Sequence, residues 1–244
     1  MVRLRFPKRH CTWMCVLLIE ASAQSNAADS PPVEVYLGST TITAVDGARE
    51  DCGQLQLNAD GVYGAAFGWQ YGGVQAPYYG AFAECYSGSA EVCAVVFDFT
   101  KTSDNGPGRM DAYIWSDDAG QPGNVVCVVM NVDPGVVAFW PEASRHVIAL
   151  PPGCCVGETW WAGYWPNWPG QSVRWWTTAD LSDVSGCPFT NIPPGVGYPT
   201  GWHNVSVVWG PHNALGIGAE AVPCAPTPAL HSSWGAVKAT YTTD

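Results

Sequence analysis

The residues best suited to ligand chemistry are tryptophans, which gather between residues 160 and 176 of a chain that holds 13 of them in 244 residues. Indole rings on a rigid sheet stack on sugar rings, and nearby amide or guanidinium groups bond the hydroxyls. The alternative is that these rings fill the core or cover the ends of a sheet. The predicted ligand contacts are Trp168 and Trp176 first, then Trp161 and Trp165, with Asn167 and Arg174 as hydrogen-bonding groups.

Alternation along a strand predicts which of these rings face outward. In residues 160–165 the odd-numbered side chains fall on the face opposite the even-numbered ones. In residues 172–177 we expect the side that carries Arg174 to be exposed, which makes Trp176 the open ring. Trp168 lies in a loop of prolines and glycine, where burial is least assured.

Paired carboxylates offer a second chemistry, acid and base catalysis on an extracellular polymer. None of the acids stands in a diagnostic motif, and the chain has no G-x-S-x-G serine elbow and no G-x-x-x-x-G-K nucleotide loop. His203 and His212 flank a predicted strand and would lie near its opposite ends. A copper or zinc centre would also need a third ligand, and the sequence offers no candidate for it. An enzyme, a hydrolase or lyase, is therefore the alternative, and a non-catalytic protein is the favoured interpretation. The candidate acids are Glu84, Asp98, Asp111, Glu142, Glu158 and Glu220.

Cysteines predict a disulfide framework. An even number remains after the first 27 residues, and neither a C-x-x-C pair nor a suitable histidine spacing favours zinc. The local pairing that we expect is Cys85 with Cys93, across a short hairpin. Adjacent residues on a strand point to opposite faces, so Cys154 and Cys155 are expected to have different partners. The candidates for up to four bonds are Cys52, Cys85, Cys93, Cys127, Cys154, Cys155, Cys187 and Cys224.

Asp117 and Asp118 begin a loop with two interpretations. An aspartate side chain accepts backbone N–H groups in an Asx-turn, and Gly120 and Pro122 supply turn geometry. The same carboxylates with backbone carbonyls could hold a structural calcium ion, although the D-x-D-x-D-G ligand order is missing. The turn is the favoured interpretation, and we predict no other cofactor.

Short β-prone runs separated by turns must position these groups. Pro-Gly occurs six times, and no window shows a sustained helical period. These features predict an all-β fold, an antiparallel, jelly-roll-like β-sandwich stabilised by disulfides. Residues 125–130 are apolar on both sides, which is typical of a central strand. The expected strands are 33–37, 62–69, 92–99, 110–115, 125–132, 146–150, 160–165, 172–177, 205–209 and 237–241.

The first 27 residues have the pattern of an export signal: a basic start, a short apolar run and small residues at a cleavage position. We therefore predict a secreted or cell-surface protein with a single domain over residues 28–244. The signal would remove four basic residues and one acidic one, which leaves 6 basic and 20 acidic residues. This negative charge argues against nucleic acid as a partner. No apolar run reaches the roughly 20 residues of a membrane span.

Three segments resemble secreted bacterial β-sandwich modules of large exported or cell-surface proteins. The segment 111–126, DAYIWSDDAGQPGNVV, resembles their strand–loop–strand motif, and 79–84 (YGAFAE) and 233–238 (SWGAVK) are also similar to them. The resemblance spans residues 50–241. It implies a jelly-roll architecture shared with carbohydrate-binding domains, and its motifs are structural rather than catalytic.

The sequence thus predicts a secreted, non-catalytic binding or cell-surface module that recognises a polysaccharide or cell-surface glycan through exposed tryptophans, or mediates adhesion. One alternative is the carboxylate hydrolase or lyase on the same fold. The other is an extracellular structural subunit that assembles with copies of itself through apolar patches.

Overall fold

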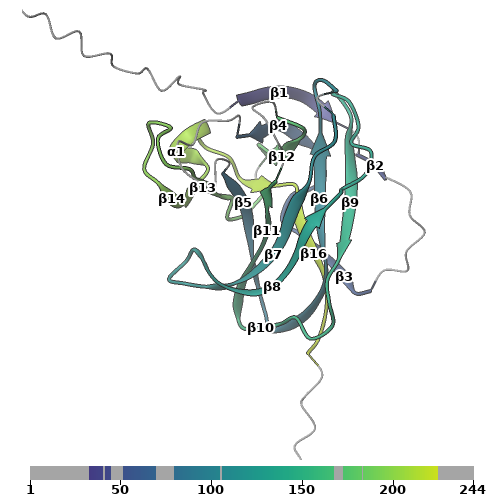
Figure 1. Ribbon diagram of the computed structural model, residues 1–244, viewed down its shortest axis with the longest axis vertical. Coiled ribbons are helices and arrows are strands. Elements are labelled where there is room, and N and C mark those ends of the chain that lie inside the picture. Colours follow the sequence, from purple (N-terminus) through teal and green to yellow (C-terminus); the bar gives the residue numbers. More distant parts are fainter. Residues whose placement is uncertain are drawn as a thin grey trace, which may run out of the picture.

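Two β-sheets face each other in the structure, a computed structural model (Figure 1). It describes residues 33–40, 42–44, 52–69, 80–104, 106–167, 173–182 and 184–224, and within the first two ranges only the side chain of Ile42. The ten-stranded sheet contains β1 (Val33–Thr40), β2 (Ile42–Ala44), β3 (Gln54–Leu57), β4 (Tyr63–Gly68), β6 (Ala90–Thr100), β9 (Ala143–Ala149), β10 (Cys155–Val156), β12 (Trp176–Asp180), β15 (Ala214–Leu215) and β16 (Ile217–Val222). The six-stranded sheet contains β5 (Ala81–Ser87), β7 (Met110–Asp117), β8 (Pro122–Val132), β11 (Thr159–Pro166), β13 (Phe189–Ile192) and β14 (Gly201–Asn204).

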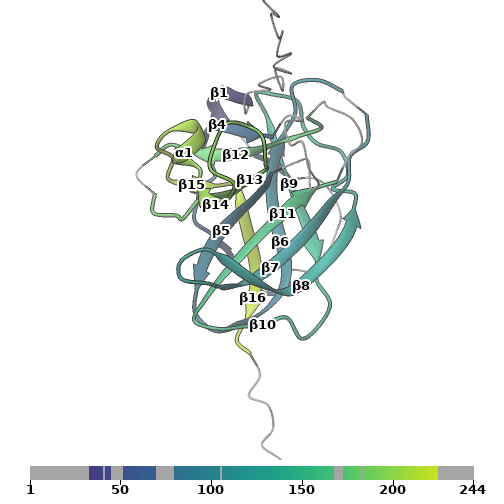
Figure 2. The same cartoon turned by 60° about the vertical axis from the view of Figure 1, so that its left-hand side comes forward.

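Strand order places the tryptophan-rich strand β11 in the middle of its sheet. The six-stranded sheet runs β14-β13-β5-β11-β7-β8, and Figure 2 shows β5, β11, β7 and β8 side by side. The main path of the other sheet is β1-β4-β12-β6-β16-β3. Neighbours are antiparallel except for β2 and β9, which pair in parallel. The predicted class, an antiparallel β-sandwich of jelly-roll-like architecture, is confirmed.

The core lies between the sheets and follows the two-residue period of the strands. In β11 the even-numbered side chains point inward, and those of Trp160 and Tyr164 are fully buried. Phe97 and Phe99 of β6 face them, and each ring lies edge-on to Tyr164, with centroids 5.3 and 5.2 Å apart. Burying one such side chain stabilises the fold by about 2–3 kcal/mol.

Two predicted strands differ from the structure. The strand predicted for residues 205–209 is instead a single helical turn, α1 (Ser206–Trp209), with Val205 as its N-cap. The strand predicted for residues 172–177 begins later than expected, since β12 (Trp176–Asp180) starts at Trp176. No helix among the described residues is long and apolar enough to cross a membrane. The predicted run 237–241 lies outside the described residues.

The position predicted for residues 125–130 was wrong. They belong to β8, which is the last strand of the six-stranded sheet and pairs with β7 alone among the described strands. Val125 and Met130 are 52% and 68% exposed. An apolar pattern on both faces is therefore compatible with an exposed edge as well as with a central strand.

Three disulfides tie the sandwich together: Cys52–Cys93, Cys85–Cys187 and Cys127–Cys154. The predicted Cys85–Cys93 pair was wrong because the chain changes sheets between β5 and β6. Cys85 lies on the outer face of the six-stranded sheet and Cys93 on the outer face of the other, so the core separates them. Cys154 is buried and Cys155 exposed, which confirms their opposite faces.

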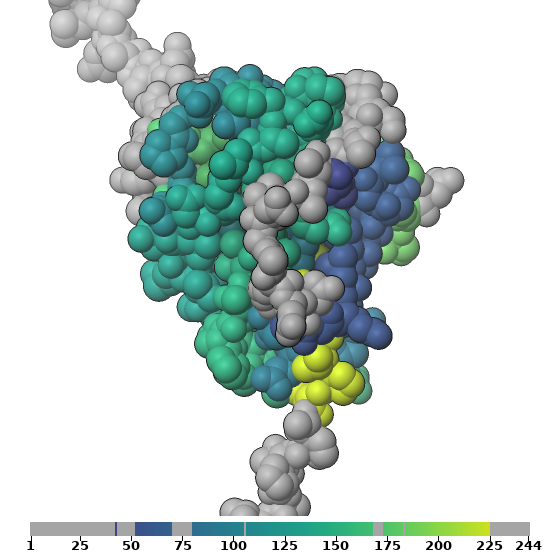
Figure 3. All heavy atoms as spheres, turned by 90° about the vertical axis from the view of Figure 1, so that its right-hand side faces the viewer, coloured from purple at the N-terminus to yellow at the C-terminus, as the bar shows by residue number. Residues whose placement is uncertain are grey.

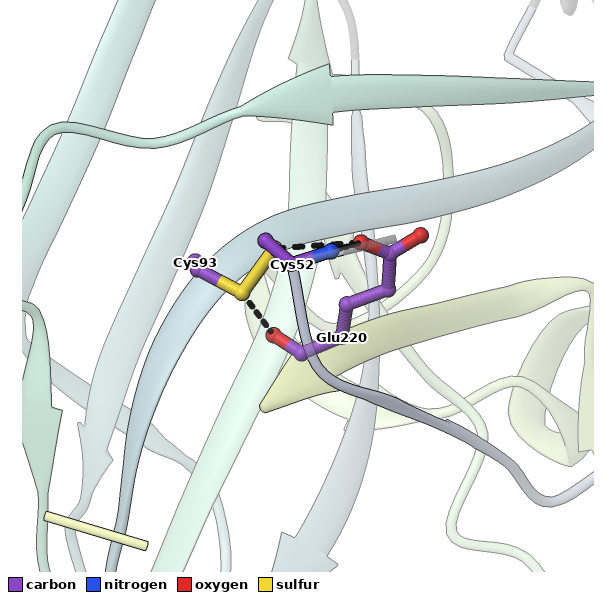
Figure 4. A group of neighbouring side chains, drawn as sticks. All are labelled: Cys52, Cys93 and Glu220. Atoms are coloured by element: carbon purple, nitrogen blue, oxygen red, sulfur yellow. Dashed lines mark hydrogen bonds between the residues drawn. A yellow bond between two sulfur atoms is a disulfide. The ribbon is translucent and has the colours of Figure 1, made fainter. Parts of the chain in front are cut away.

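The Cys52–Cys93 disulfide lies beside β16, which ends at the lower end of the molecule (yellow in Figure 3). In Figure 4 the Cys52–Cys93 bond lies against Glu220 of β16, whose carboxylate accepts the Cys52 backbone N–H at 3.1 Å. The two sulfurs and the carboxylate lie within 4.8 Å of one another, as metal ligands would. Metals bind thiolates, and these sulfurs are bonded to each other, so the group is a disulfide beside a buried carboxylate.

Candidate functional site

The outer face of the six-stranded sheet is the candidate site, and β11 supplies its centre. Because β11 alternates, Trp161, Gly163 and Trp165 point away from the core, as predicted. Register places Trp161 directly opposite Trp115 of β7, and Trp165 opposite Asp111 of the same strand. Residues that pair directly across strands share a face, so these side chains meet on the outside of the sheet.

Six rings form what we call the aromatic face. Tyr113 and Trp115 stack with centroids 4.8 Å apart and an angle of 11° between planes. Trp202 of β14 meets Trp115 edge-on at 5.3 Å and Trp165 at 6.4 Å. Edge-to-face and offset contacts of this kind are the favourable geometries for aromatic pairs. The aromatic face consists of Tyr113, Trp115, Trp161, Trp165, Phe189 and Trp202.

Small residues at the centre of the sheet let rings from distant strands meet. Three strands, β11, β5 and β13, separate the strands that carry Trp115 and Trp202. On this face β5 and β11 present Ala83 and Gly163, which pair with each other and leave room above the backbone. A Cβ on Gly163 would lie 2.1 Å from the Phe82 carbonyl oxygen, so glycine is also required by the close approach of β5.

Exposure divides the aromatic face into a buried floor and an accessible rim. Trp115 and Trp161 are 4% and 2% exposed, so Trp161 is not the open ring that the sequence predicted. Tyr113, Trp165 and Trp202 are half-buried. Phe189 is also half-buried and lies edge-on to Trp161. The floor therefore positions the half-buried rings, which present a surface to a ligand.

Asp117 fixes the floor. Its Oδ1 accepts the indole N–H of Trp161 at 2.9 Å, and its Oδ2 accepts the backbone N–H of Gly120 at 3.1 Å. Asp118 exchanges two backbone hydrogen bonds with Gln121, which closes the hairpin. These bonds give the loop the Asx-turn role predicted for it. Both carboxylate oxygens of Asp117 thus have donors from the protein. Calcium at Asp117 and Asp118 stays a prediction that nothing here tests.

A hollow of about 370 Å³ opens at one end of the aromatic face. Two hydrogen bonds fix its lining: Asp111 Oδ1 accepts the Asn131 backbone N–H at 2.7 Å, and the Asn167 backbone N–H donates to the Arg109 carbonyl at 2.7 Å. Burial, followed by the charge of Asp111, raises the pKa of Tyr113, so its hydroxyl is a donor at neutral pH. The hollow is lined by Asp111, Tyr113, Trp165, Pro166 and Asn167.

The remaining predicted contacts lie elsewhere. Trp176 is 6% exposed and belongs to the core, so the prediction of an open ring was wrong. The reason is that β12 begins only at this residue, and strand alternation does not extend back to Arg174. Arg174 lines a second hollow of about 510 Å³ with Lys101 and Trp175. Trp168 lies outside the described residues.

Sequence reasoning missed Trp202, Tyr113 and Phe189 as members of the site. Trp202 lies on β14, a four-residue strand too short to show alternation. Its contact with Trp115 joins positions far apart in the sequence, and no local pattern encodes it. Tyr113 did carry a signal, because it occupies an outward position between Asp111 and Trp115.

The carboxylates do not form a catalytic pair around the hollow. Of the six candidate acids, Asp111 lines it. Glu84 is fully buried, and it accepts hydrogen bonds from the Asn58 side chain and from the backbone of Cys187 and Leu215. Burial raises its pKa to about 7. Asp98 is also fully buried and lies on the outer side of the other sheet.

Ser144 and His146 have the geometry of a nucleophile and its base, but both are buried and a substrate cannot reach them. His146 Nδ1 lies 2.5 Å from the Pro134 carbonyl, which can only accept, so Nε2 is left to accept the Ser144 hydroxyl at 2.8 Å. Burial lowers the pKa of His146, which keeps the ring neutral. Ser144 and His146 are 1% and 3% exposed, so the pair holds the segment around Pro134 and meets no substrate.

No protein-family model, curated protein or solved structure matches this chain. The resemblance to modules of exported bacterial proteins therefore stays a prediction. Function has to be argued from the geometry of the aromatic face itself.

Proposed function

We propose that this protein is a secreted or cell-surface module that binds a neutral glycan on the aromatic face without catalysis. The observation that carries the proposal is the half-buried rim of Tyr113, Trp165 and Trp202 beside a hollow with Asp111 and Asn167. Flat rings held by a rigid floor and adjoining hydrogen-bonding groups are the two components that sugar recognition needs.

The chemistry of the hollow favours a polyhydroxyl ligand. The Asp111 carboxylate accepts hydroxyl donors, the exposed Asn167 amide both donates and accepts, and Trp165 supplies a wall on which a pyranose ring can stack. The chain has a formal net charge of −11, which disfavours a polyanionic glycan through long-range repulsion. A neutral polysaccharide therefore fits both the local groups and the overall charge.

The test is retention on insoluble neutral polysaccharides (cellulose, chitin, xylan and mannan), followed by calorimetry with oligosaccharides of the polymer that is retained. We expect binding with no release of reducing ends, and its loss in Trp165→Ala and Trp202→Ala. Phe139→Ala is the matched control, since Phe139 is an exposed ring that contacts Lys101 away from this face. Equal loss in all three variants, or binding unchanged in both tryptophan variants, would refute the proposal.

Self-association is the second candidate function, and strand β8 is the observation that favours it. This edge strand is 11 residues long, has no charged side chain, and exposes Val125, Val126 and Met130. Edges of this kind pair readily with another strand. Light scattering over a concentration series without ligand tests it: a rising mass that Val126→Lys abolishes supports assembly, and a constant mass excludes it.

A further inference from the structure

Two cysteines of the described residues stand outside the three disulfides. Cys155 is exposed and Cys224 is half-buried, and neither is bonded in the structure. Every other cysteine between residues 52 and 224 is paired. Two cysteines without a disulfide partner are independent surface thiols if they lie far apart. If they lie close together, they can form a disulfide with each other.

Register brings these two cysteines to the same place. β10 and β16 flank β6 and pair with it antiparallel, and both reach the same residue: Cys155 pairs with Glu91 on one side, and Val222 pairs with Glu91 on the other. Cys224 follows Val222, the last residue of β16, by two residues. The end of β16 lies at the lower end of the molecule (yellow in Figure 3).

The two side chains lie close enough to interact: a hydrogen bond with Cys224 is the largest cause of the raised pKa of the Cys155 thiol, about 11. The charge of Glu91 acts in the same direction. Neutral thiols within hydrogen-bonding distance need only a small movement to reach the geometry of a disulfide.

We propose that Cys155 and Cys224 form a fourth disulfide, a surface latch that fastens the end of β16 to β10. The oxidant is a disulfide of the glutathione class. One protein thiolate attacks it to give a mixed disulfide and one glutathione thiol, and the second protein thiolate then displaces the other. Two S–H bonds are broken and one protein S–S bond forms. The oxidant takes up the two electrons and two protons and becomes two thiols.

Exposure separates Cys155 from the cysteines of the other three bonds, which are all half-buried or buried. Its neighbour in sequence, Cys154, is fully buried in its bond with Cys127, whereas Cys155 is open to solvent. Thiol–disulfide exchange requires access of the attacking thiolate, so the latch is the first bond that a mild reductant opens. Because Cys155 is protonated at neutral pH, closure by glutathione disulfide is faster at pH 9 than at pH 7.

The experiment maps cysteines in the full 244-residue chain after incubation with glutathione disulfide. The protein is then blocked with N-ethylmaleimide, digested with pepsin at acid pH, and analysed by mass spectrometry with and without reduction. Since Cys154 and Cys155 share a peptide, we expect one linked cluster that contains the peptides of Cys127, Cys154–Cys155 and Cys224. Peptide mapping assigns Cys11 and Cys15 separately. Maleimide on both Cys155 and Cys224, with the Cys127–Cys154 bond intact, would overturn the proposal.

Two matched variants and a reduction series make the assignment specific. Cys155→Ser releases the Cys224 peptide and leaves the Cys127 peptide attached, while Cys224→Ser leaves maleimide on Cys155. Circular dichroism checks that both variants fold. In a dithiothreitol series the latch opens at a lower reductant concentration than the other three bonds. Its opening together with them, or after them, would refute the surface latch.

Discussion

The two outer faces of the sandwich differ in how they use polar side chains. On the six-stranded sheet, Asp117 holds the Trp161 indole so that rings beyond it remain half-exposed. On the ten-stranded sheet, polar side chains bond one another and are withdrawn from solvent. Asp98 receives two bonds from Arg145, at 2.8 and 2.7 Å, and one from the Tyr63 hydroxyl at 2.5 Å.

This difference separates a surface that can bind from one that only stabilises. Asp98 is fully buried with every donor supplied by the protein, so it has no capacity left for a ligand. Burial, then the charge of Asp98, raises the pKa of Tyr63 far above its usual value, which keeps the phenol protonated as a donor. A strongly perturbed group is thus a weaker guide to function here than a half-exposed ring with ordinary chemistry.

Glu84 is a third case, because it is buried between the sheets and accepts hydrogen bonds from neutral donors. These donors are the Asn58 side chain and the backbone N–H groups of Cys187 and Leu215. Asp98 has a guanidinium to balance its charge, whereas Glu84 does not, and burial raises the pKa of Glu84 to about 7. The two acids should therefore respond differently to mutation and to pH.

The largest effect should come from Arg145→Met. The variant leaves the Asp98 charge buried beside Tyr63 without its partner, and breaking a buried pair in this way costs about 3–5 kcal/mol. Urea unfolding measures the loss. The double variant Arg145→Met/Asp98→Asn should recover part of it, because the unpaired charge is gone. A single-variant loss below about 1 kcal/mol would mean that the pair behaves as an exposed salt bridge.

The next effect is a pH dependence that belongs to Glu84. Its pKa is raised from 4.5 to about 7 in the folded protein, so folding favours the protonated acid. The contribution is complete below pH 4.5 and is lost as the pH rises through 7, which amounts to about 3 kcal/mol at 1.36 kcal/mol per unit. Glu84→Gln should remove this slope from urea-unfolding free energies measured between pH 4.5 and 8.

The difference between wild type and Glu84→Gln isolates this acid from other titrations. His146, whose pKa burial lowers, acts in the opposite direction: its neutral ring favours folding as the pH rises past its ordinary value. Its contribution is common to both proteins and cancels. Parallel curves for the two proteins would contradict the raised pKa of Glu84.

Sequence reasoning succeeded for β11 and β7 but missed β5, a seven-residue strand between β13 and β11. β11 and β7 span eight residues each, with one face in the core and the other on the outside of the sheet, so the period of two is visible in the residue types. It failed for β16, half of whose Ile217–Val222 run is glycine and alanine, and for the four-residue β13 and β14. Short strands with small side chains acquire their position from their neighbours rather than from their own pattern.

The burial of Asp98 is not visible in its own strand, for a physical reason. Alternation with Phe97 and Phe99 places it on the outer side of β6, where contact with water is the ordinary expectation. Arg145 comes from the paired strand β9 and Tyr63 from β4, and together they bond the carboxylate. A local pattern fixes the face of a side chain but not what covers that face.

Truncation of a rim ring should cost ligand affinity with little loss of stability. For Trp165→Ala we expect about 2 kcal/mol, or roughly 30-fold in Kd for the retained oligosaccharide, as for aromatic hot spots in binding sites. The matched floor variant Trp161→Ala should instead lower the thermal unfolding temperature, because Trp161 is 2% exposed. Equal effects of the two variants on affinity and on stability would erase the distinction between floor and rim.

The smallest expected loss of stability comes from Asp117→Asn, which tests the hydrogen bonds that position Trp161. Asp117→Asn keeps the size of the side chain but removes the charge that accepts the Trp161 indole N–H and the Gly120 backbone N–H. We expect a loss of about 1–2 kcal/mol, since hydrogen bonds to charged groups contribute about that much. Thermal unfolding with and without EDTA distinguishes the two roles of the loop. If Asp117 acts through these bonds, EDTA leaves the wild-type unfolding temperature unchanged. If the loop holds calcium, EDTA lowers the wild-type temperature toward that of the variant.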